Sequence, residues 1–170
     1  MRATLIVLSM ILLPGAAGET TAPAAYNIAH GAMETADRLR DAHNPLLPFL
    51  VAEITAANAS VNATEAATLL LAAGECNDTD PLLLAALARF ESHYRRNRIG
   101  AAGERGMLQI HPCHKKSMKA AGLDFYSEAD RLTYACMLYA EQGWKPWTVR
   151  EKAKKEYYRL QLAYVDWEGE

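Results

Sequence analysis

Residues 80–92 read Asp80-Pro81-Leu82-Leu83-Leu84-Ala85-Ala86-Leu87-Ala88-Arg89-Phe90-Glu91-Ser92. The pattern predicts a buried helix that runs to about Arg96, because apolar side chains recur at helical spacing and form one face. Thr79 or Asp80 can cap the first turn, where the missing N–H of Pro81 costs nothing. Glu91 therefore lies at the edge of the apolar face rather than on the solvent side.

Helical patterns continue on both sides of this stretch, while strand-type alternation of apolar and polar residues is scarce. Hydrophobic residues make up 51% of the chain, with alanine and leucine dominant. This composition argues against a disordered chain and favours an all-α domain. Further helices are expected over residues 45–57, 62–73, 114–121, 127–143 and 149–164. Gly74 is expected to end the second of these.

The first 18 residues have the layout of a secretory signal peptide. Arg2 precedes a short apolar run, and small residues follow up to Ala17 and Gly18. The run is too short to span a bilayer comfortably, since that takes about 20 apolar residues. We expect cleavage after Ala17 or Gly18, with an uncleaved membrane anchor as the alternative.

The remainder of the chain is long enough for one domain with a single core. Residues 19–75 are interpreted as a linker and an N-terminal helical extension, with a weak helical stretch over residues 32–41. Residues 76–148 form the expected core, and residues 149–170 a C-terminal helix that packs on it. The formal net charge of −2 provides no basic stripe, which argues against a nucleic-acid partner.

Glu91 is the candidate catalytic residue. Burial on the apolar side of a helix raises the pKa of a carboxyl group, because a low dielectric disfavours the charged form. A carboxylic acid that stays protonated near neutral pH can protonate a leaving oxygen, as a glycosidase requires. From its position alone, the alternative is a structural glutamate paired with Arg95 or Arg98.

The segment that follows the helix is rich in glycine. Gly100, Gly103 and Gly106 allow the backbone to turn tightly and to approach a ligand closely. Gln109 carries both a donor and an acceptor, which suits sugar hydroxyls or an N-acetyl group. Taken alone, such a loop is also compatible with a plain connector.

Two blocks of the sequence resemble the lytic transglycosylase family with the lysozyme-like fold of the soluble lytic transglycosylases. That family has a Glu-Ser pair at a helix end, followed by Gly-x-x-Gly-Leu-Met-Gln and an apolar residue. The matching blocks are Glu91-Ser92 and Gly103-Glu104-Arg105-Gly106-Met107-Leu108-Gln109-Ile110. The resemblance extends over about residues 76–148 and implies a lysozyme-like helical domain, with extra N-terminal helices after the signal peptide.

The sequence departs from the family pattern at three places. Met107-Leu108 inverts the usual Leu-Met order, a mild change because the two volumes are close. Glu104 stands where a small residue is usual. The family's later Asn-Ile…Gly…Tyr-Leu block has its nearest match at residues 131–139, which lack the Asn and the Gly.

The resemblance implies a peptidoglycan lytic transglycosylase that works without a cofactor. Glu91 would protonate the glycosidic oxygen between N-acetylmuramic acid and N-acetylglucosamine. Its carboxylate would then take the proton of the muramyl 6-hydroxyl, which attacks its own sugar carbon and leaves a 1,6-anhydro end. A second carboxylate is dispensable because the nucleophile is tethered to the substrate.

The candidate substrate-binding residues are Ser92, Gly106, Met107, Gln109, Tyr139 and Trp147. Ser92 and Gln109 are expected to position and hydrogen-bond Glu91. Tyr139 and Trp147 could flank a sugar ring, with ordinary core packing as the alternative.

Two other functions remain open on the sequence. A hydrolytic muramidase of the same fold would need a second carboxylate, for which Glu104, Asp124 and Glu128 are candidates. A catalytically inactive domain that only binds glycan strands or supports an assembly is the other. The end groups of the product discriminate between the two enzymes.

Three cysteines occur, and export makes a disulfide between two of them expected. We favour Cys113–Cys136, with Cys76–Cys113 as the alternative pairing. His111 and His114 flank Cys113, but no second ligand pair of recognisable spacing accompanies them, so no metal site is expected.

The signal peptide and the resemblance together predict a periplasmic bacterial protein, or one associated with a phage. The expected partners are peptidoglycan glycan strands, and a cell-envelope-spanning machine or a phage particle is a further possibility. We expect a monomer.

Overall fold

The computed structural model describes residues 44–168, and within them every regular element is a helix and no strand occurs, which confirms the all-α prediction. The expected signal peptide over residues 1–18 and the weak helix over residues 32–41 lie outside the described residues. The elements are α2 (Leu46–Ala57), α3 (Ala63–Cys76), α4 (Pro81–Glu91), the 3-10 turn η1 (Pro112–His114), α5 (Lys115–Ala120), α6 (Glu128–Gln142) and α7 (Arg150–Glu168). None of these helices is long and apolar enough to cross a bilayer.

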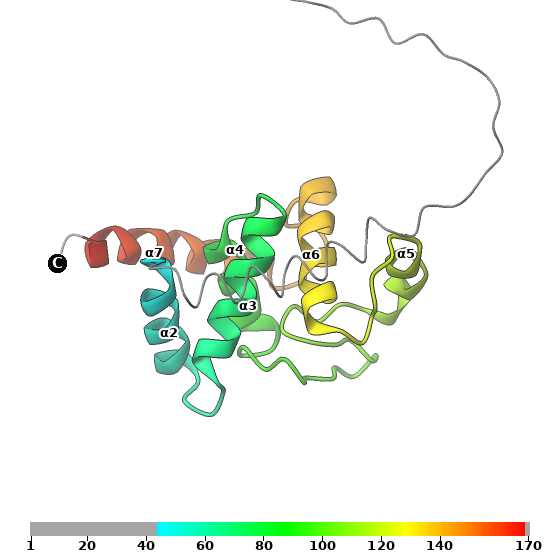
Figure 1. Cartoon of the computed structure of the whole chain (residues 1–170), viewed down its shortest axis with the longest axis horizontal. Coiled ribbons are helices and arrows are strands. Elements are labelled where there is room, and N and C mark those ends of the chain that lie inside the picture. The colour runs from blue at the N-terminus through cyan, green and yellow to red at the C-terminus, as the bar shows by residue number, and fades with distance from the viewer. Residues whose placement is uncertain (1–43, 169–170) are drawn as a thin grey trace, which may run out of the picture.

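Helix α4 occupies the interior of the molecule. Figure 1 shows α2 and α7 towards one end, α5 at the other, and α3, α4 and α6 between them. Helix α4 packs against α3 and α7, while α3 also packs against α2 and α6. Every residue from Leu82 to Ala88 is buried. A helix that is apolar on all sides has to be enclosed by others, which explains this central position.

Helix α4 begins as expected but ends earlier. Asp80 caps it, its Oδ1 accepting a hydrogen bond from the Leu82 N–H at 2.9 Å. The helix stops at Glu91 rather than near Arg96, because His93 and Tyr94 take left-handed backbone angles, with φ of 54° and 62°. The turn thereby places Glu91 at the last position of a buried helix.

Gly74 does not end α3, which continues to Cys76. Its role is a close approach instead. A Cβ at this position would lie 2.5 Å from the carbonyl oxygen of Thr79 and 2.7 Å from Cγ of Pro81. Glycine is therefore needed because the connection to α4 crosses directly over the helix.

Helix α7 forms side-chain contacts with both ends of α4. Near the end of α4, Arg89 pairs with Glu156 at 2.7 Å. At its start, the hydroxyl of Tyr157 donates to Oδ2 of the capping residue Asp80 at 2.8 Å. Because α4 ends in Glu91, these contacts of the C-terminal helix help to fix the candidate acid.

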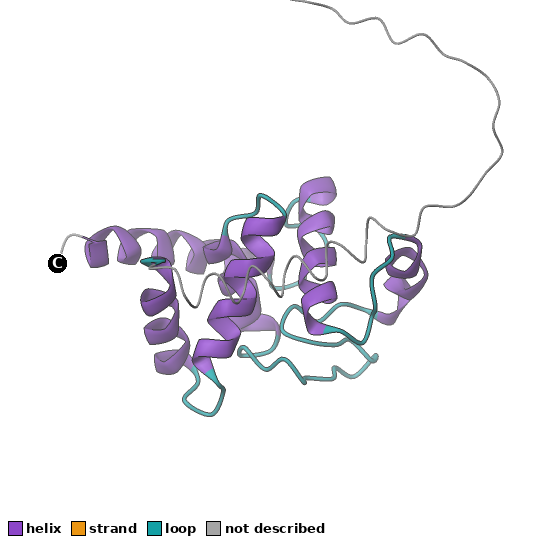
Figure 2. Ribbon diagram, in the orientation of Figure 1, coloured by secondary structure: helices purple, strands orange, loops and turns teal. Residues whose placement is uncertain are grey.

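The segment between α4 and η1 carries no helix and runs along one edge of the molecule (Figure 2). It is held by its own backbone. Arg105 and Ile110 exchange two N–H···O bonds of 3.0 Å, and the N–H of Gly106 donates to the carbonyl of Arg98 at 3.0 Å. The loop is therefore a defined structure that can present side chains to a cavity.

Candidate active site

Glu91 lines a cavity of about 460 Å³. The other walls come from residues 98–111, from Leu138 of α6 and from residues 146–148 before α7. Burial, together with the smaller effect of the negative charge of Glu104, raises the pKa of Glu91 from 4.5 to about 7. The carboxyl group can therefore both give and take a proton near neutral pH.

Glu104 is the one candidate for a second carboxylate that lines the same cavity as Glu91. Its Oε2 accepts a hydrogen bond from the Ala102 N–H at 3.0 Å, which holds it on the glycine-rich loop. Asp124 lies at a different surface depression, beside Tyr126. Glu128 is partly buried and does not line the cavity of Glu91.

Gln109 also lines the cavity, where it adopts a left-handed φ of 50°. Its Nε2 donates to the carbonyl oxygens of Gly106 at 2.8 Å and Arg98 at 3.3 Å. These bonds fix the amide and leave Oε1 as an acceptor for a ligand. A Cβ on Gly100 would lie 2.8 Å from that Oε1 and 2.3 Å from Oε2 of Glu104, so glycine there makes room for both side chains.

Three expected substrate contacts lie below the cavity instead. The side chain of Ser92 is fully buried and donates to the carbonyl of Ala88 at 3.2 Å, so it hydrogen-bonds α4 rather than Glu91. Met107 is also fully buried in the core. Gly106 is buried against α6. The prediction that these three residues contact a sugar directly is wrong, because they are buried. They support the residues that line the cavity instead.

The structure separates the two candidate aromatic residues. Trp147 lines the cavity beside Glu91, and its Nε1–H donates to the carbonyl of Leu108 at 3.3 Å. Tyr139 does not line that cavity; its ring meets the edge of Trp144, with centroids 5.6 Å apart. Trp147 alone is placed to contact a ligand held by Glu91.

Two histidines belong to the cavity although the sequence interpretation assigned them no role there. His111 and His114 both line it. Nδ1 of His114 lies 3.1 Å from the hydroxyl of Tyr134, and burial, with the neighbouring His111 next, lowers the pKa of His114. The sequence could have indicated that His111 lies near the cavity, because it directly follows the block that ends in Gln109-Ile110.

Residues 68–134 match the family model described as the Transglycosylase SLT domain. No curated protein and no solved structure matches the chain. This similarity points to a transglycosylase that acts on peptidoglycan.

The SLT match includes Glu91 and Gln109, but the cavity is completed by residues beyond it. The match ends at residue 134, within α6. Leu138 and Trp147, which line the cavity, follow later in the chain. The helical segment up to residue 67 precedes the match, and α2 packs on the α3 helix in which the match begins.

A largely buried ion pair within the matched stretch supports the glycine-rich loop. Oε1 of Glu128 accepts from the Met107 N–H at 2.7 Å, and Oε2 lies 2.5 Å from Nη2 of Arg131. Arg131 also donates to the carbonyl of Phe125 at 2.6 Å. Burial raises the pKa of Glu128, while its bond from Met107 and the charge of Arg131 oppose this effect. The sequence could have predicted this pair, because Glu128 and Arg131 are three residues apart on a helix.

The expected Cys113–Cys136 disulfide is not formed. Cys113 is an exposed free thiol on η1, which excludes the alternative pairing with Cys76 as well. Cys136 is buried, and its Sγ lies 3.6 Å from the carbonyl oxygen of Ala73. The prediction was wrong because Cys136 faces α3 and not the turn that carries Cys113. Within residues 44–168, no three His, Cys, Asp or Glu side chains gather into a group able to hold a metal ion.

Proposed function

We propose that this protein is a lytic transglycosylase that cleaves the bond between N-acetylmuramic acid and N-acetylglucosamine in peptidoglycan, with Glu91 as its single acid and base. One observation carries the proposal. Glu91 ends a buried helix and lines a cavity together with Gln109 and Trp147, and its pKa is raised to about 7. A group with this pKa can serve in both protonation states at the pH of a bacterial envelope.

The reaction needs two proton transfers at one carboxyl group. Protonated Glu91 gives its proton to the glycosidic oxygen as the bond from that oxygen to C1 of the muramyl sugar breaks. N-acetylglucosamine leaves with a free 4-hydroxyl. The Glu91 carboxylate then accepts the proton of the muramyl 6-hydroxyl while its oxygen bonds to C1. The product ends in a 1,6-anhydro ring, no water is consumed, and Glu91 is again protonated.

Other cavity residues support this chemistry. The fixed amide of Gln109 offers Oε1 to a sugar hydroxyl or to the N–H of an N-acetyl group. Trp147 offers part of an aromatic ring, although only 5% of its surface is exposed. The 6-hydroxyl belongs to the substrate itself, so closure of the ring has the advantage of an intramolecular reaction.

The product of digested sacculi tests the proposal. The expected result is anhydro-muropeptides, each lighter by one water than a hydrolysed reducing end in the mass spectrum. Glu91→Gln should lose at least about 100-fold in rate, since it can neither give nor accept the proton. Glu141→Gln is the matched control, because Glu141 is exposed on α6 and away from the cavity. Retained activity in Glu91→Gln would identify another residue as the acid.

The position of Glu104 in the cavity supports one alternative function. Because it shares the cavity with Glu91, it could serve as the second carboxylate of a hydrolytic muramidase. That enzyme would release reducing ends only, and Glu104→Gln would abolish cleavage as fully as Glu91→Gln. Anhydro ends that persist in Glu104→Gln would reject it.

We further propose that residues 1–18 direct export to the periplasm, where peptidoglycan lies. The apolar run after Arg2 and the small residues up to Gly18 support this location. Cell fractionation with N-terminal sequencing tests it: the mature protein should begin at Gly18 or Glu19 and appear in the periplasmic fraction. An intact Met1 in the cytoplasm would contradict it.

A further inference from the structure

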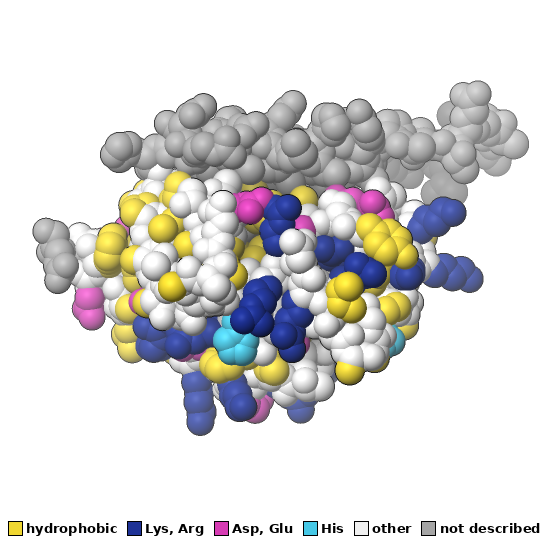
Figure 3. All heavy atoms as spheres, turned by 90° about the horizontal axis from the view of Figure 1, so that it is seen from below, with side chains coloured by type: hydrophobic (Ala, Val, Ile, Leu, Met, Phe, Trp, Pro, Cys, Tyr) yellow, Lys and Arg dark blue, Asp and Glu magenta, His cyan; other side chains and the backbone are white. Residues whose placement is uncertain are grey.

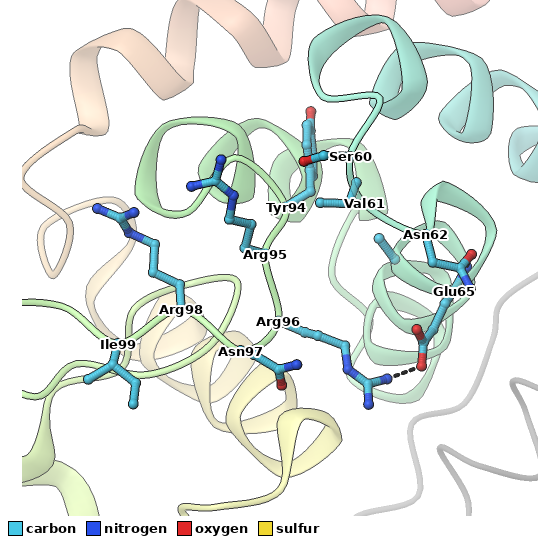
Figure 4. Close-up of a pocket in the computed structure, with 11 residues that line it drawn as sticks. Ser60, Val61, Asn62, Glu65, Tyr94, Arg95, Arg96, Asn97, Arg98 and Ile99 are labelled. Carbon is cyan, nitrogen blue, oxygen red and sulfur yellow. Dashed lines mark hydrogen bonds and ion pairs between the residues drawn. The ribbon is translucent and has the colours of Figure 1, made fainter.

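A second and larger cavity, of about 630 Å³, shares Arg98 in its lining with the cavity of Glu91. One wall is the turn at residues 60–62 with the start of α3, and the other is the segment 94–99 that follows α4 (Figure 4). Its volume is in the range of small-molecule sites. We call it the arginine pocket, after Arg95, Arg96 and Arg98, which line it.

The arginine pocket carries uncompensated positive charge. Arg96 pairs with Glu65, the one acidic residue of the lining. Arg95 and Arg98 are exposed, and no carboxylate within residues 44–168 forms an ion pair with either. In Figure 4 their guanidinium groups extend to the same side of the segment, away from Glu65. Figure 3, a view of the underside of Figure 1, shows more basic than acidic side chains on that face.

The two walls are fastened to each other before any ligand binds. Nδ2 of Asn58 donates to the carbonyl oxygen of His93 at 2.8 Å. The Arg96–Glu65 ion pair is a second contact between the two walls. The left-handed angles of His93 and Tyr94 turn the chain so that the arginines follow directly after the catalytic helix. A preformed pocket lowers the ordering cost of binding.

Arg98 connects the arginine pocket to the cavity of Glu91, since it lines both. A muramyl residue held at Glu91 carries a stem peptide with free carboxylates. We propose that the arginine pocket binds these stem carboxylates through Arg95 and Arg98, so that the enzyme selects glycan strands that still carry their peptides. Guanidinium groups suit this ligand because their paired N–H donors match the two oxygens of a carboxylate. The inference rests on the proposed function of Glu91.

Binding of two chemically defined substrates tests the arginine pocket. One is a soluble muropeptide chain with intact stem peptides, and the other is the same chain with its stems removed by an amidase. Dissociation constants are measured by calorimetry on Glu91→Gln, which prevents turnover. The stem-bearing chain should bind at least about tenfold more tightly, as expected for a pair of charge-assisted hydrogen bonds.

The variants locate this preference. Arg95→Gln combined with Arg98→Gln should remove most of the tenfold advantage. Arg95→Gln alone, which does not line the cavity of Glu91, should remove a large part of it. Lys116→Gln with Lys155→Gln is the matched control: it deletes two exposed charges at α5 and α7, outside the arginine pocket, and should keep the advantage.

The outcomes separate the two proposals. Equal affinity for both chains, or an equal loss in the lysine control, overturns the arginine pocket as a stem site. If the unsubstituted protein cleaves the stem-free chain while showing no stem preference, the function of Glu91 stands without the pocket. If it cleaves neither chain, the proposed function fails, and the stem site fails with it.

Discussion

At the scale of single residues, Glu91 and Glu104 form a pair in which each charge affects the other. The pKa of Glu91 is about 7, mainly through burial and secondarily through the charge of Glu104. If Glu91 acts as the general acid, kcat/KM falls as the pH rises through this pKa. Glu104→Gln removes the smaller cause and therefore lowers the pKa of Glu91.

We accordingly expect Glu104→Gln to move the alkaline limb of the pH–rate profile to lower pH, by about half a unit to one unit. The rate well below that limb should change little, because the acid itself is intact. The measurement is kcat/KM against pH on solubilised glycan strands, with Glu141→Gln as a control. A shift to higher pH, or none, would contradict the coupling.

At the scale of elements, the loop that carries Gln109 rests on the Glu128–Arg131 pair of α6. Gly106 makes this possible: its φ is +82°, and a Cβ there would lie 2.2 Å from Oε2 of Glu128. Gly143 offers a matched comparison, since its φ is +60° but nothing lies within 4 Å of a Cβ. Both positions have a positive φ, which strains an alanine by roughly 1–3 kcal/mol, and Gly106 alone adds a collision.

Gly106→Ala should therefore lower Tm further than Gly143→Ala and also reduce kcat at least about tenfold, because the ion pair and the loop must shift. Gly143→Ala should cost a few degrees and keep its activity. Thermal melts and turnover on the same preparations give both readouts. Equal turnover in the two variants would mean that the pair serves stability alone.

The sequence was sufficient for the elements whose signals are local. The cap at Asp80 followed by Pro81, and the cap at Ser127, mark helix starts where the structure has them. The early end of α4 was missed because two ordinary residues, His93 and Tyr94, take left-handed angles without a glycine to announce it. Likewise, the burial of Ser92 depends on contacts with distant segments, which no local pattern encodes.

At the scale of the whole molecule, stability and function oppose each other at Glu91. Its folded pKa, near 7, exceeds the unfolded value of 4.5. The folded state is therefore favoured while the carboxyl is protonated in both states, and this advantage is lost as the pH rises from about 4.5 to 7. Glu156 acts in the opposite sense. Although its burial opposes the shift, Arg159 and Arg89 lower its pKa, so its contribution is lost in acid.

Glu91→Gln mimics the protonated form at every pH, so the variant should not lose stability as the pH rises through the pKa of Glu91. At pH 8 the free energy of unfolding of the variant should exceed that of the parent protein by about 2 kcal/mol, after allowance for partial exposure of the side chain. The variant should therefore unfold at a higher temperature. At pH 4 the two should coincide, because the parent is then protonated as well. Glu141→Gln should melt with the parent at both values. Calorimetric scans at the two pH values check this, and a Glu91→Gln variant less stable than the parent at pH 8 would mean that the buried acid contributes to the fold rather than straining it.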